Sequence, residues 1–394
     1  MKAEPASSEL AAATAGAAPA SGVTASRRLA IGLALVAGAG FTTLAYLRFA
    51  TFHNGNFDLG FYTRMAWGLA HGDAWDPIVG ADVRGLHLSP VVGVIGWIAR
   101  VTTLPLPPLL LAAQGLAVAL ATWPMARIGE RHLGRWGALL GASVWLLHPN
   151  LGHVASYDFH PGTLAVLPLA LACDAVDSRR LPTLAVGIAG VACCREDLVL
   201  PAALLATLLA VSLRRRGWPT RTWLSAAGLG AAAIGYLAYW ALVLHPMYAP
   251  PVGSLELHFG RLGGSVSEVA ITLLTRPHVV LADAVREGRA WQLPLLLLPL
   301  AFAPLLSPRW LVAAAPVLVL NMLSTWPNTQ GLYTHYATPI LPMLATAAIV
   351  GAGKLRGRFG RAGVVASCAP ALAAVIGHAL VGGTPASVFW DRAA

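Results

Sequence analysis

The sequence has few charged residues and few cysteines. Only 11% of its 394 residues are charged, whereas 57% are hydrophobic, and the mean hydropathy is +0.65. A soluble domain carries about a quarter charged residues, so this composition excludes an ordinary soluble protein and indicates a membrane protein with several spans. Cys173, Cys193, Cys194 and Cys368 lie within or beside apolar runs, so we expect neither a disulfide framework nor a thiolate metal site.

Several motifs are absent as well. The chain has no Walker-type phosphate loop, no glycine fingerprint of a dinucleotide-binding fold and no HExxH zinc motif. No internal repeat of the transporter type is evident. A net charge of +10 would suggest a nucleic-acid partner in a soluble protein. Here the basic residues form short clusters between apolar runs, which is the pattern that sets membrane topology, so we expect no nucleic-acid partner.

Eleven apolar segments could cross a bilayer, whose hydrocarbon core of about 30 Å needs about 20 helical residues, or fewer where the bilayer thins. They are residues 29–49, 104–126, 136–151, 162–176, 181–194, 198–213, 222–244, 291–306, 310–323, 336–350 and 363–381. The two segments that flank Arg195 could instead form one broken helix. Residues 91–101 are too short to cross and are expected to lie on the membrane surface or to re-enter it.

The clusters of Lys and Arg predict the orientation. With a cytoplasmic N-terminus, 17 of the 27 basic residues fall on the inner side, as the positive-inside rule requires. Ten of the twelve histidines then fall on or near the outer face. We therefore expect a multi-pass protein of the cytoplasmic membrane. Its predicted parts are a disordered inner tail (1–28), a membrane domain (29–382) with outer loops at 51–90 and 245–290, the second lid-like, and a short external tail (383–394).

The first outer loop is the first long polar stretch in a very apolar chain. Asn54 to Asn56 is typical of a turn with a helix cap. The apolar spacing that follows predicts an amphipathic helix lying along the bilayer surface. Asp58 falls in its first turn, where the helix dipole keeps a carboxylate ionised. It could act as a general base or a metal ligand, although its position alone favours a capping acid on a solvated loop. Ser89 and Pro90 predict the start of another helix.

Three further stretches carry candidate site residues. Asp158 and His160 alternate about Phe159, so a strand would point both to one side, where they could hold a divalent metal or a phosphate; helix capping is the alternative. The run Arg195-Glu196-Asp197 has no polar buffer around it, so its charges either pair with one another or line a cavity that binds phosphate. His335 lies between two tyrosines near the predicted outer interface.

Five segments, in chain order, carry a family resemblance: FDLGFYTRMAW, HLSP, DFHP, REDL and NMLSTWP with YTHYATPILP. They resemble a family of predicted bacterial membrane proteins of unknown function, which is similar to the GT-C superfamily of lipid-dependent glycosyltransferases. The resemblance covers roughly residues 29–350. It implies an all-α, GT-C-like fold of about eleven spans with surface helices in a large first outer loop. It also implies that Asp58 matches the superfamily's acid and that His87 lies near the donor phosphate.

The resemblance implies transfer of a sugar from a polyprenyl-phosphate donor to an unidentified acceptor on the outer membrane face. Asp58 would accept the proton of the acceptor hydroxyl, and His87, Arg64, Arg84, Arg195 or a metal would stabilise the leaving phosphate. Many GT-C enzymes carry two adjacent acids, but Asp58 stands alone, so the use of magnesium or manganese held by Asp58 and His160 stays open. A transporter or flippase of a lipid-linked or anionic substrate is the main competing function, and a non-catalytic scaffold is the third.

Overall fold

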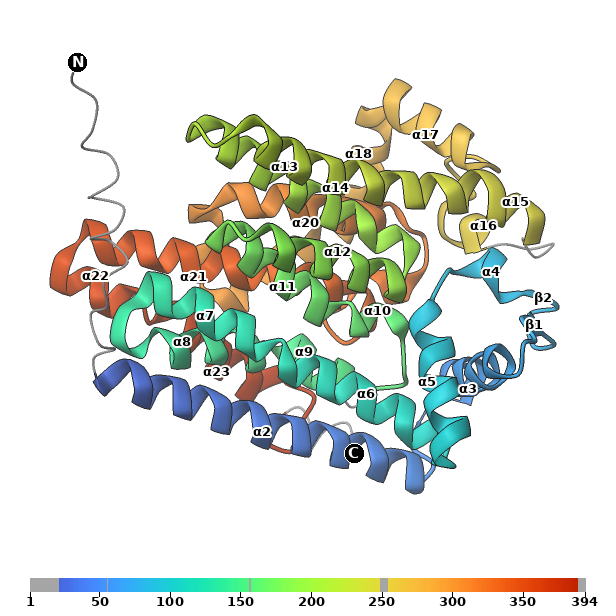
Figure 1. The fold of residues 1–394 in the computed structure, drawn as a ribbon, viewed down its shortest axis with the longest axis horizontal. Coiled ribbons are helices and arrows are strands. Elements are labelled where there is room, and N and C mark those ends of the chain that lie inside the picture. The colour runs from blue at the N-terminus through green and yellow to red at the C-terminus, as the bar shows by residue number, and fades with distance from the viewer. Residues whose placement is uncertain (1–20, 55, 156, 249–253, 389–394) are drawn as a thin grey trace, which may run out of the picture.

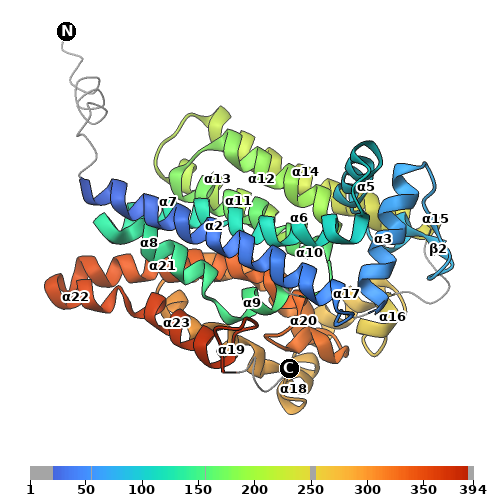
Figure 2. The same cartoon turned by 90° about the horizontal axis from the view of Figure 1, so that it is seen from below.

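The computed structural model describes residues 21–388 except 55, 156 and 249–253. Long helices lie side by side along one axis, and shorter helices lie across one end of this bundle (Figures 1 and 2). The helices along the axis are α2 (Ser21–Ala50), α6 (Leu106–Leu120), α7 (Thr122–Leu133), α8 (Gly137–Leu146), α9 (Pro149–Ala155), α10 (Pro161–Leu164), α11 (Val166–Ser178), α12 (Leu181–Cys194), α13 (Val199–Arg215), α14 (Thr220–Tyr239), α19 (Gln292–Leu297), α20 (Pro308–Leu323), α21 (Leu341–Arg358), α22 (Gly360–Ala366) and α23 (Ala369–Val381).

The remaining elements are short. Those near one end of the bundle are α3 (Asn56–Ala70), β1 (Trp75–Asp76), β2 (Ala81–Asp82), α4 (Val83–Leu86), α5 (Pro90–Thr102), α15 (His245–Tyr248), α16 (Ser254–Phe259), α17 (Val266–Thr275) and α18 (Pro277–Arg286). The 3-10 segments are Gly134–Trp136, Glu196–Leu198, Arg289–Trp291, Leu298–Leu300, Ala303–Leu306, Pro327–Gln330 and His335–Ile340, and Trp240–Leu244 is a π-helical turn. The two strands pair antiparallel, with Trp75 opposite Asp82.

Six helical stretches of the described chain are long and apolar enough to cross a membrane. They are Ala25–Ala50, Leu106–Leu146, Glu196–Arg215, Thr220–Tyr248, His335–Arg358 and Gly360–Val381. The prediction of an all-α membrane protein is therefore confirmed. The count of eleven crossings stays a prediction, since Leu181–Cys194 and Pro308–Leu323 are apolar but shorter.

The stretch Leu106–Leu146 folds back on itself between α7 and α8. Gly134 takes a φ of 75° at the reversal, a conformation that glycine adopts without strain. A Cβ added to Gly129 or to Gly137 would collide with the carbonyl oxygen of the other glycine. The two backbones therefore approach directly, as helices with small residues do in membranes. This reversal agrees with the two separate segments predicted at 104–126 and 136–151.

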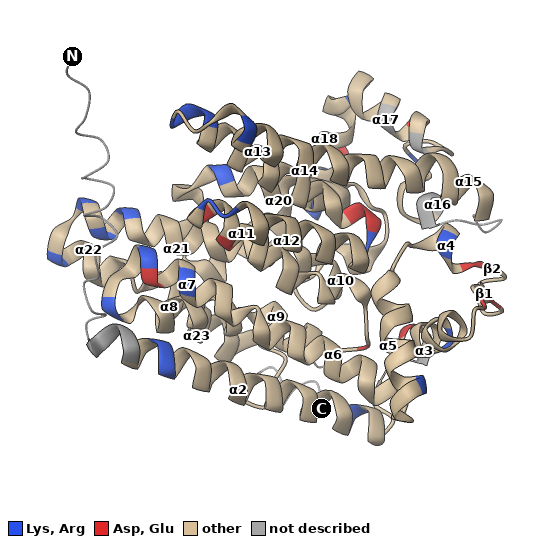
Figure 3. Cartoon of the chain, in the orientation of Figure 1, with Lys and Arg blue, Asp and Glu red and all other residues tan. Residues whose placement is uncertain are grey.

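The two ends of the bundle differ in charge. Figure 3 shows many Lys and Arg gathered where α7 meets α8, α13 meets α14 and α21 meets α22, with a few acidic residues on α7 and α11, whereas acidic and basic residues are mixed at the opposite end. We call the first the basic end and the second, which carries α3 to α5, the mixed end. This asymmetry is the one expected when the basic end faces the cytoplasm. The orientation itself stays a proposal.

A buried ionic cluster holds helices together at the basic end. Asp174 on α11 is fully buried, and one of its carboxylate oxygens lies 2.6 Å from Nη2 of Arg131 while the other lies 3.3 Å from Nη1 of Arg127. Asp177, one turn later, accepts from Nε of Arg131 and pairs with His132 at 2.9 Å. The cluster therefore ties α7 to α11 by charge-assisted bonds, which are the strong class of hydrogen bonds.

The mixed end contains the two predicted surface helices. α3 is seen nearly end-on in Figure 1 and lies across the axis of α2 in Figure 2. α5 also crosses the bundle axis. Gly96 lets α5 pack so closely against α3 that a Cβ at this position would collide with the carbonyl oxygen of Ala66. Pro90 is the first residue of α5, as predicted. Neither Ser89 nor Asn54 makes a side-chain hydrogen bond with a described residue, so the predicted capping bonds are not found in the described chain.

The chain termini differ from the prediction in part. The predicted disordered tail 1–28 is too long, because α2 already begins at Ser21; residues 1–20 lie outside the described residues. Within the predicted external tail, Gly383 packs against the backbone of His153, and the amide of Val388 donates to the carbonyl of Ala379. This first part of the tail is therefore packed on the bundle, and residues 389–394 lie outside the described chain.

Candidate functional site

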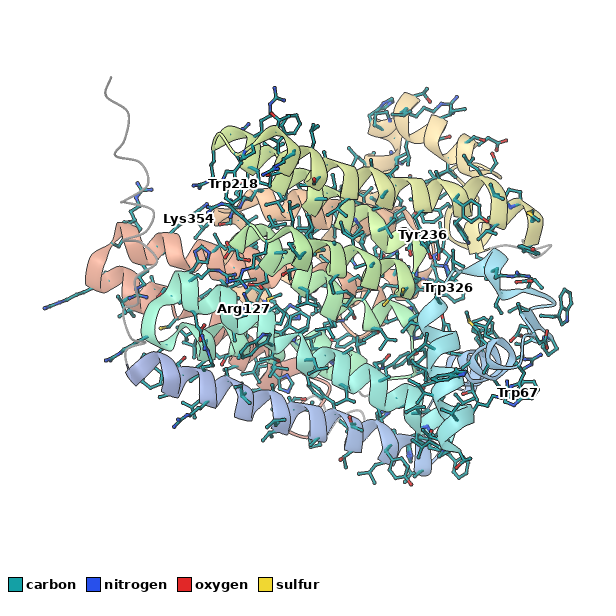
Figure 4. All side chains as sticks on the ribbon, in the orientation of Figure 1. Trp67, Arg127, Trp218, Tyr236, Trp326 and Lys354 are labelled. Atoms are coloured by element: carbon teal, nitrogen blue, oxygen red, sulfur yellow. The ribbon has the colours of Figure 1, made fainter. Side chains whose placement is uncertain are left out.

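Polar and aromatic side chains from six separate parts of the chain meet at the mixed end. They come from α3, the junction of α4 with α5, the turn after α9, the break between α12 and α13, and the segments around α16 and His335. We call this set the site cluster. It consists of Asp58, Tyr62, His87, His160, Arg195, Glu196, Asp197, His258, His335 and Tyr336. Tyr236 and Trp326 lie at this side of the bundle in Figure 4.

Asp58 and His160, which were paired in the sequence only as possible metal ligands, are brought together. Oδ2 of Asp58 lies 3.5 Å from Nε2 of His160, which is ion-pair distance rather than a tight hydrogen bond. The Asp58 side chain is 35% exposed, whereas that of His160 is 7% exposed. Among the described residues, no other ion pair involves Asp58. The carboxylate is therefore accessible, with a buried imidazole behind it.

The ring of His160 also stacks on the ring of His335. This contact could not be predicted from either sequence segment alone. The ring centroids are 3.3 Å apart with planes 15° from parallel. Tyr62 meets the edge of His160, and Tyr336 lies beside His335 with a centroid distance of 4.2 Å. The predicted strand around Phe159 does not form, and Tyr157 stacks on the same imidazole instead of facing away from it. The aromatic rings thus fix His160 behind the Asp58 carboxylate.

The Arg195-Glu196-Asp197 run is split between two roles. Arg195 donates through Nε and Nη2 to the two carboxylate oxygens of Asp197, at 2.7 and 2.6 Å. Glu196 turns the other way, is almost fully buried, and accepts from Nδ1 of His87 and from the amide of Leu88, both at 2.8 Å. The interpretation that these charges pair is therefore met for Arg195 and Asp197, while phosphate binding stays a prediction. Glu196 positions His87, which is 29% exposed.

The pKa shifts show that these charges act on one another. Burial raises the pKa of Tyr62 well above its usual value; Arg195 opposes this, and Asp58 reinforces it. Burial acts to lower the pKa of Arg195, but the charge and hydrogen bonds of Asp197 more than offset it, so its pKa is raised. Since the charges of Arg195 and Asp58 both act on the pKa of Tyr62, the cation and the accessible carboxylate share one electrostatic environment.

Two predicted site residues, Arg64 and Arg84, lie elsewhere, and a third, Asp158, lies beside the site cluster. Arg64 pairs with Asp73 at 2.6 Å within the first loop, and Arg84 pairs with Asp82 and lies over the ring of Tyr248. Neither contacts the site cluster through any bond found in the described chain. Asp158 is buried beside the cluster, and its carbonyl oxygen accepts from Nδ1 of His160 at 3.2 Å.

Two buried amides position the site. Gln114 on α6 accepts the amide hydrogen of His160 at 3.0 Å and donates to the carbonyl of Val154 at 2.8 Å. Asn150 donates to the carbonyls of Leu332 and Thr334, just before His335. Sequence reasoning missed both residues. The available signal was an amide side chain within an apolar run, which must be hydrogen-bonded when it is buried.

The donor set does not fit a resident metal. A resident divalent ion needs three or more protein ligands, whereas magnesium that arrives with a substrate needs only one or two carboxylates beside the substrate's phosphate. Asp58 and His160 lie together, but no group of three or more His, Cys, Asp or Glu residues in the described chain could hold an ion. Glu196 and Asp197 are already engaged by His87 and Arg195. We therefore assign no step to magnesium or manganese.

His258 on α16 predicts a pH dependence of stability. Burial, and the positive charges of Arg195 and His87, lower its pKa to about 4. An unfolded histidine has a pKa of about 6.5, so the unfolded chain binds more protons between these values. Stability should be complete above about pH 6.5 and should fall as the pH drops toward about 4.

The test is the melting temperature of the purified protein between pH 4 and pH 7, with His258→Asn as the matched variant. The asparagine oxygen can still accept from the Ser324 hydroxyl, which bonds Nδ1 of His258 at 2.7 Å, but it does not titrate. The variant should lose less stability on acidification than the native protein. Identical pH profiles would mean that His258 is not held neutral by its surroundings.

Comparison with known proteins agrees with this architecture. No protein of curated function matches the chain. The family described as "Predicted membrane protein (DUF2079)" matches residues 48–382, which include the site cluster and most of the bundle. The chain therefore belongs to this family of predicted membrane proteins, DUF2079.

Proposed function

We propose that the protein transfers a sugar from a polyprenyl-phosphate donor to an acceptor at the outer face of the cytoplasmic membrane. The observation that carries this proposal is the exposure of the Asp58 side chain and its position beside His160. Asp58 is an accessible carboxylate with one long contact to a buried histidine, while the cation Arg195 and the imidazole of His87 lie in the same cluster. A general base and a phosphate-binding group are the two parts that such a displacement needs.

The proposed step is a direct displacement at the anomeric carbon. The acceptor oxygen forms a bond to that carbon as its proton passes to Asp58, and the bond from the carbon to the phosphate oxygen breaks with inversion. Polyprenyl phosphate leaves with the bonding electron pair. Arg195 has Nη1 outside its pair with Asp197. His87, held at Nδ1 by Glu196, can donate through Nε2 when it is protonated. Both groups would offset the negative charge on the leaving phosphate.

The placement of the cluster suits a lipid-linked donor. α3 and α5 lie across the end of membrane-length helices (Figures 1 and 2), which is the depth at which lipid phosphates lie. The charge asymmetry of Figure 3 supports a cytoplasmic basic end and an outward-facing site cluster. A transporter of an anionic substrate would need charged residues along the middle of the bundle, whereas the charged residues of this protein gather at its two ends.

The test is thermal stabilisation of the purified protein in nanodiscs. Polyprenyl monophosphate should raise the melting temperature, because a ligand at about 100 times its Kd stabilises the native state by about 2.7 kcal/mol. His87→Gln should reduce this stabilisation, since glutamine can still donate to Glu196 but carries no positive charge.

Arg286→Gln is the matched control, because Arg286 is exposed at the end of α18 and forms no ion pair with the described residues. It should respond to the lipid as the native protein does. Stabilisation by a nucleotide sugar, with none by polyprenyl monophosphate, would contradict the proposed donor.

A further inference from the structure

A groove lies on the other side of α3 from the site cluster. It has a volume of about 460 Å³ and runs between the end of α2, the first turns of α3 and the start of α6. Its walls are largely apolar and include Phe49, Leu59 and Leu106. Asp58 and Tyr62 belong to the site cluster, whereas Gly60 and Thr63 line this groove. Successive residues of a helix point about 100° apart, so α3 serves two separate surfaces.

The groove contains polar groups that lack partners. Both side-chain atoms of Asn54 and the hydroxyl of Thr63 are buried, and none of them forms a hydrogen bond with the described chain. Leaving a buried polar group unpaired destabilises the fold, so three such atoms in one groove indicate a missing partner. Arg64 lines the same groove, and only its Nη2 is used in the hydrogen bonds to Asp73 and to the carbonyl of Trp75.

The surroundings indicate a membrane-interface position. The groove adjoins the end of Ala25–Ala50, a helix long and apolar enough to cross the membrane. Phe52 is 95% exposed and Trp67 is 49% exposed, and both line the groove. Figure 4 shows Trp67 at the edge of the molecule, away from the bundle. Exposed aromatic residues at such a level are typical of the interface between lipid tails and headgroups.

We propose that this groove binds an anionic glycerophospholipid. The apolar walls would hold part of an acyl chain, while Asn54, Thr63 and the free N–H groups of Arg64 would donate to the phosphate and ester oxygens. Three donor groups beside one apolar channel match an amphiphile whose head accepts hydrogen bonds. The site is independent of the proposed glycosyl transfer, because it uses neither Asp58 nor the cations of the site cluster.

Gly60→Trp tests the groove directly. A Cβ on Gly60 meets nothing within 4 Å, so the indole can enter the groove without displacing the backbone. The protein would be purified from vesicles of phosphatidylcholine with one-fifth phosphatidylglycerol, and bound lipid would be counted by native mass spectrometry. The native protein should retain phosphatidylglycerol, and Gly60→Trp should retain about tenfold less. Gly235→Trp on α14 is the matched control, since Gly235 is also helical, exposed and free of neighbours within 4 Å.

A second variant separates binding from folding. Asn54→Leu with Thr63→Val removes the unpaired polar atoms, so in lipid-free detergent its melting temperature should equal or exceed that of the native protein. The same variant should lose the stabilisation that added phosphatidylglycerol gives. Equal retention of phosphatidylglycerol by native protein and Gly60→Trp would overturn the proposal. Retention of polyprenyl phosphate in place of phosphatidylglycerol would overturn it too, because the groove would then hold the donor.

Discussion

Asp58→Asn is expected to lower sugar transfer per folded molecule by about 10²–10⁴-fold, the usual effect of losing a general base. Asparagine keeps the shape of the side chain and its contact with His160, but it cannot accept the acceptor's proton. The Asp58 side chain is partly exposed and has one long contact at 3.5 Å. Its loss should therefore cost little stability, and the melting temperature should change by far less than the rate. The measurement is transfer from a polyprenyl-phosphate sugar, normalised to folded protein.

Asp73→Asn is the matched control for this prediction. Asp73 lies in the same loop and pairs with Arg64, whose charge and hydrogen bond hold the pKa of that carboxyl below its usual range. Solvent screens an exposed pair of this kind, so it contributes little to stability, and Asp73 does not reach the site cluster. This variant should retain near-native transfer. Normal transfer by Asp58→Asn, or equal losses in both variants, would remove Asp58 from the mechanism.

The largest effect on stability is expected for Asp174→Asn. Its carboxylate is fully buried and faces both Arg127 and Arg131. Removing one partner of a buried ionic cluster leaves uncompensated charge, which typically costs about 3–5 kcal/mol. The change lies at the basic end, far along the bundle from the site cluster (Figure 3). The melting temperature in detergent should therefore fall by several degrees, while lipid binding by the folded fraction stays unchanged.

Glu130→Gln is the control for Asp174→Asn. Glu130 also accepts a pair of hydrogen bonds from an arginine at the same end, but Arg27 is 48% exposed. Solvent screens such a pair, so the change should cost about 1 kcal/mol or less. If Glu130→Gln destabilises the protein as much as Asp174→Asn does, burial is not what gives the Asp174 cluster its strength.

Local patterns predicted the parts of the fold that depend on local physics. The apolar spacing after Asn56 gave a surface helix, and α3 indeed lies across the bundle. Pro90 correctly marked the start of α5. The clusters of arginine fall together at one end, because every polar turn of a membrane helix must lie outside the hydrocarbon. The capping bond predicted for Ser89 does not form: its hydroxyl is buried and makes no hydrogen bond with the described chain.

Pairings between distant segments could not be read from the sequence. Asp58 and His160 were named together only as possible metal ligands, and their direct contact depends on how α3 packs against the turn after α9. His258 was counted only among the outward histidines, and the fold of the 245–290 loop places it under the influence of Arg195. Arg64 and Arg84 looked equivalent to Arg195, but nearby aspartates engage both outside the site cluster. Composition identifies charged residues in a polar loop and leaves their partners undetermined.

A cryo-EM structure of the protein in nanodiscs with bound polyprenyl monophosphate tests the central claim most directly. The proposal predicts that the phosphate lies within hydrogen-bond distance of Arg195 or His87, with the Asp58 carboxylate facing the position of the sugar's anomeric carbon and the isoprenoid chain leading into the bilayer. A phosphate bound at the basic end, or a site cluster that stays free of lipid at saturating concentration, would contradict it.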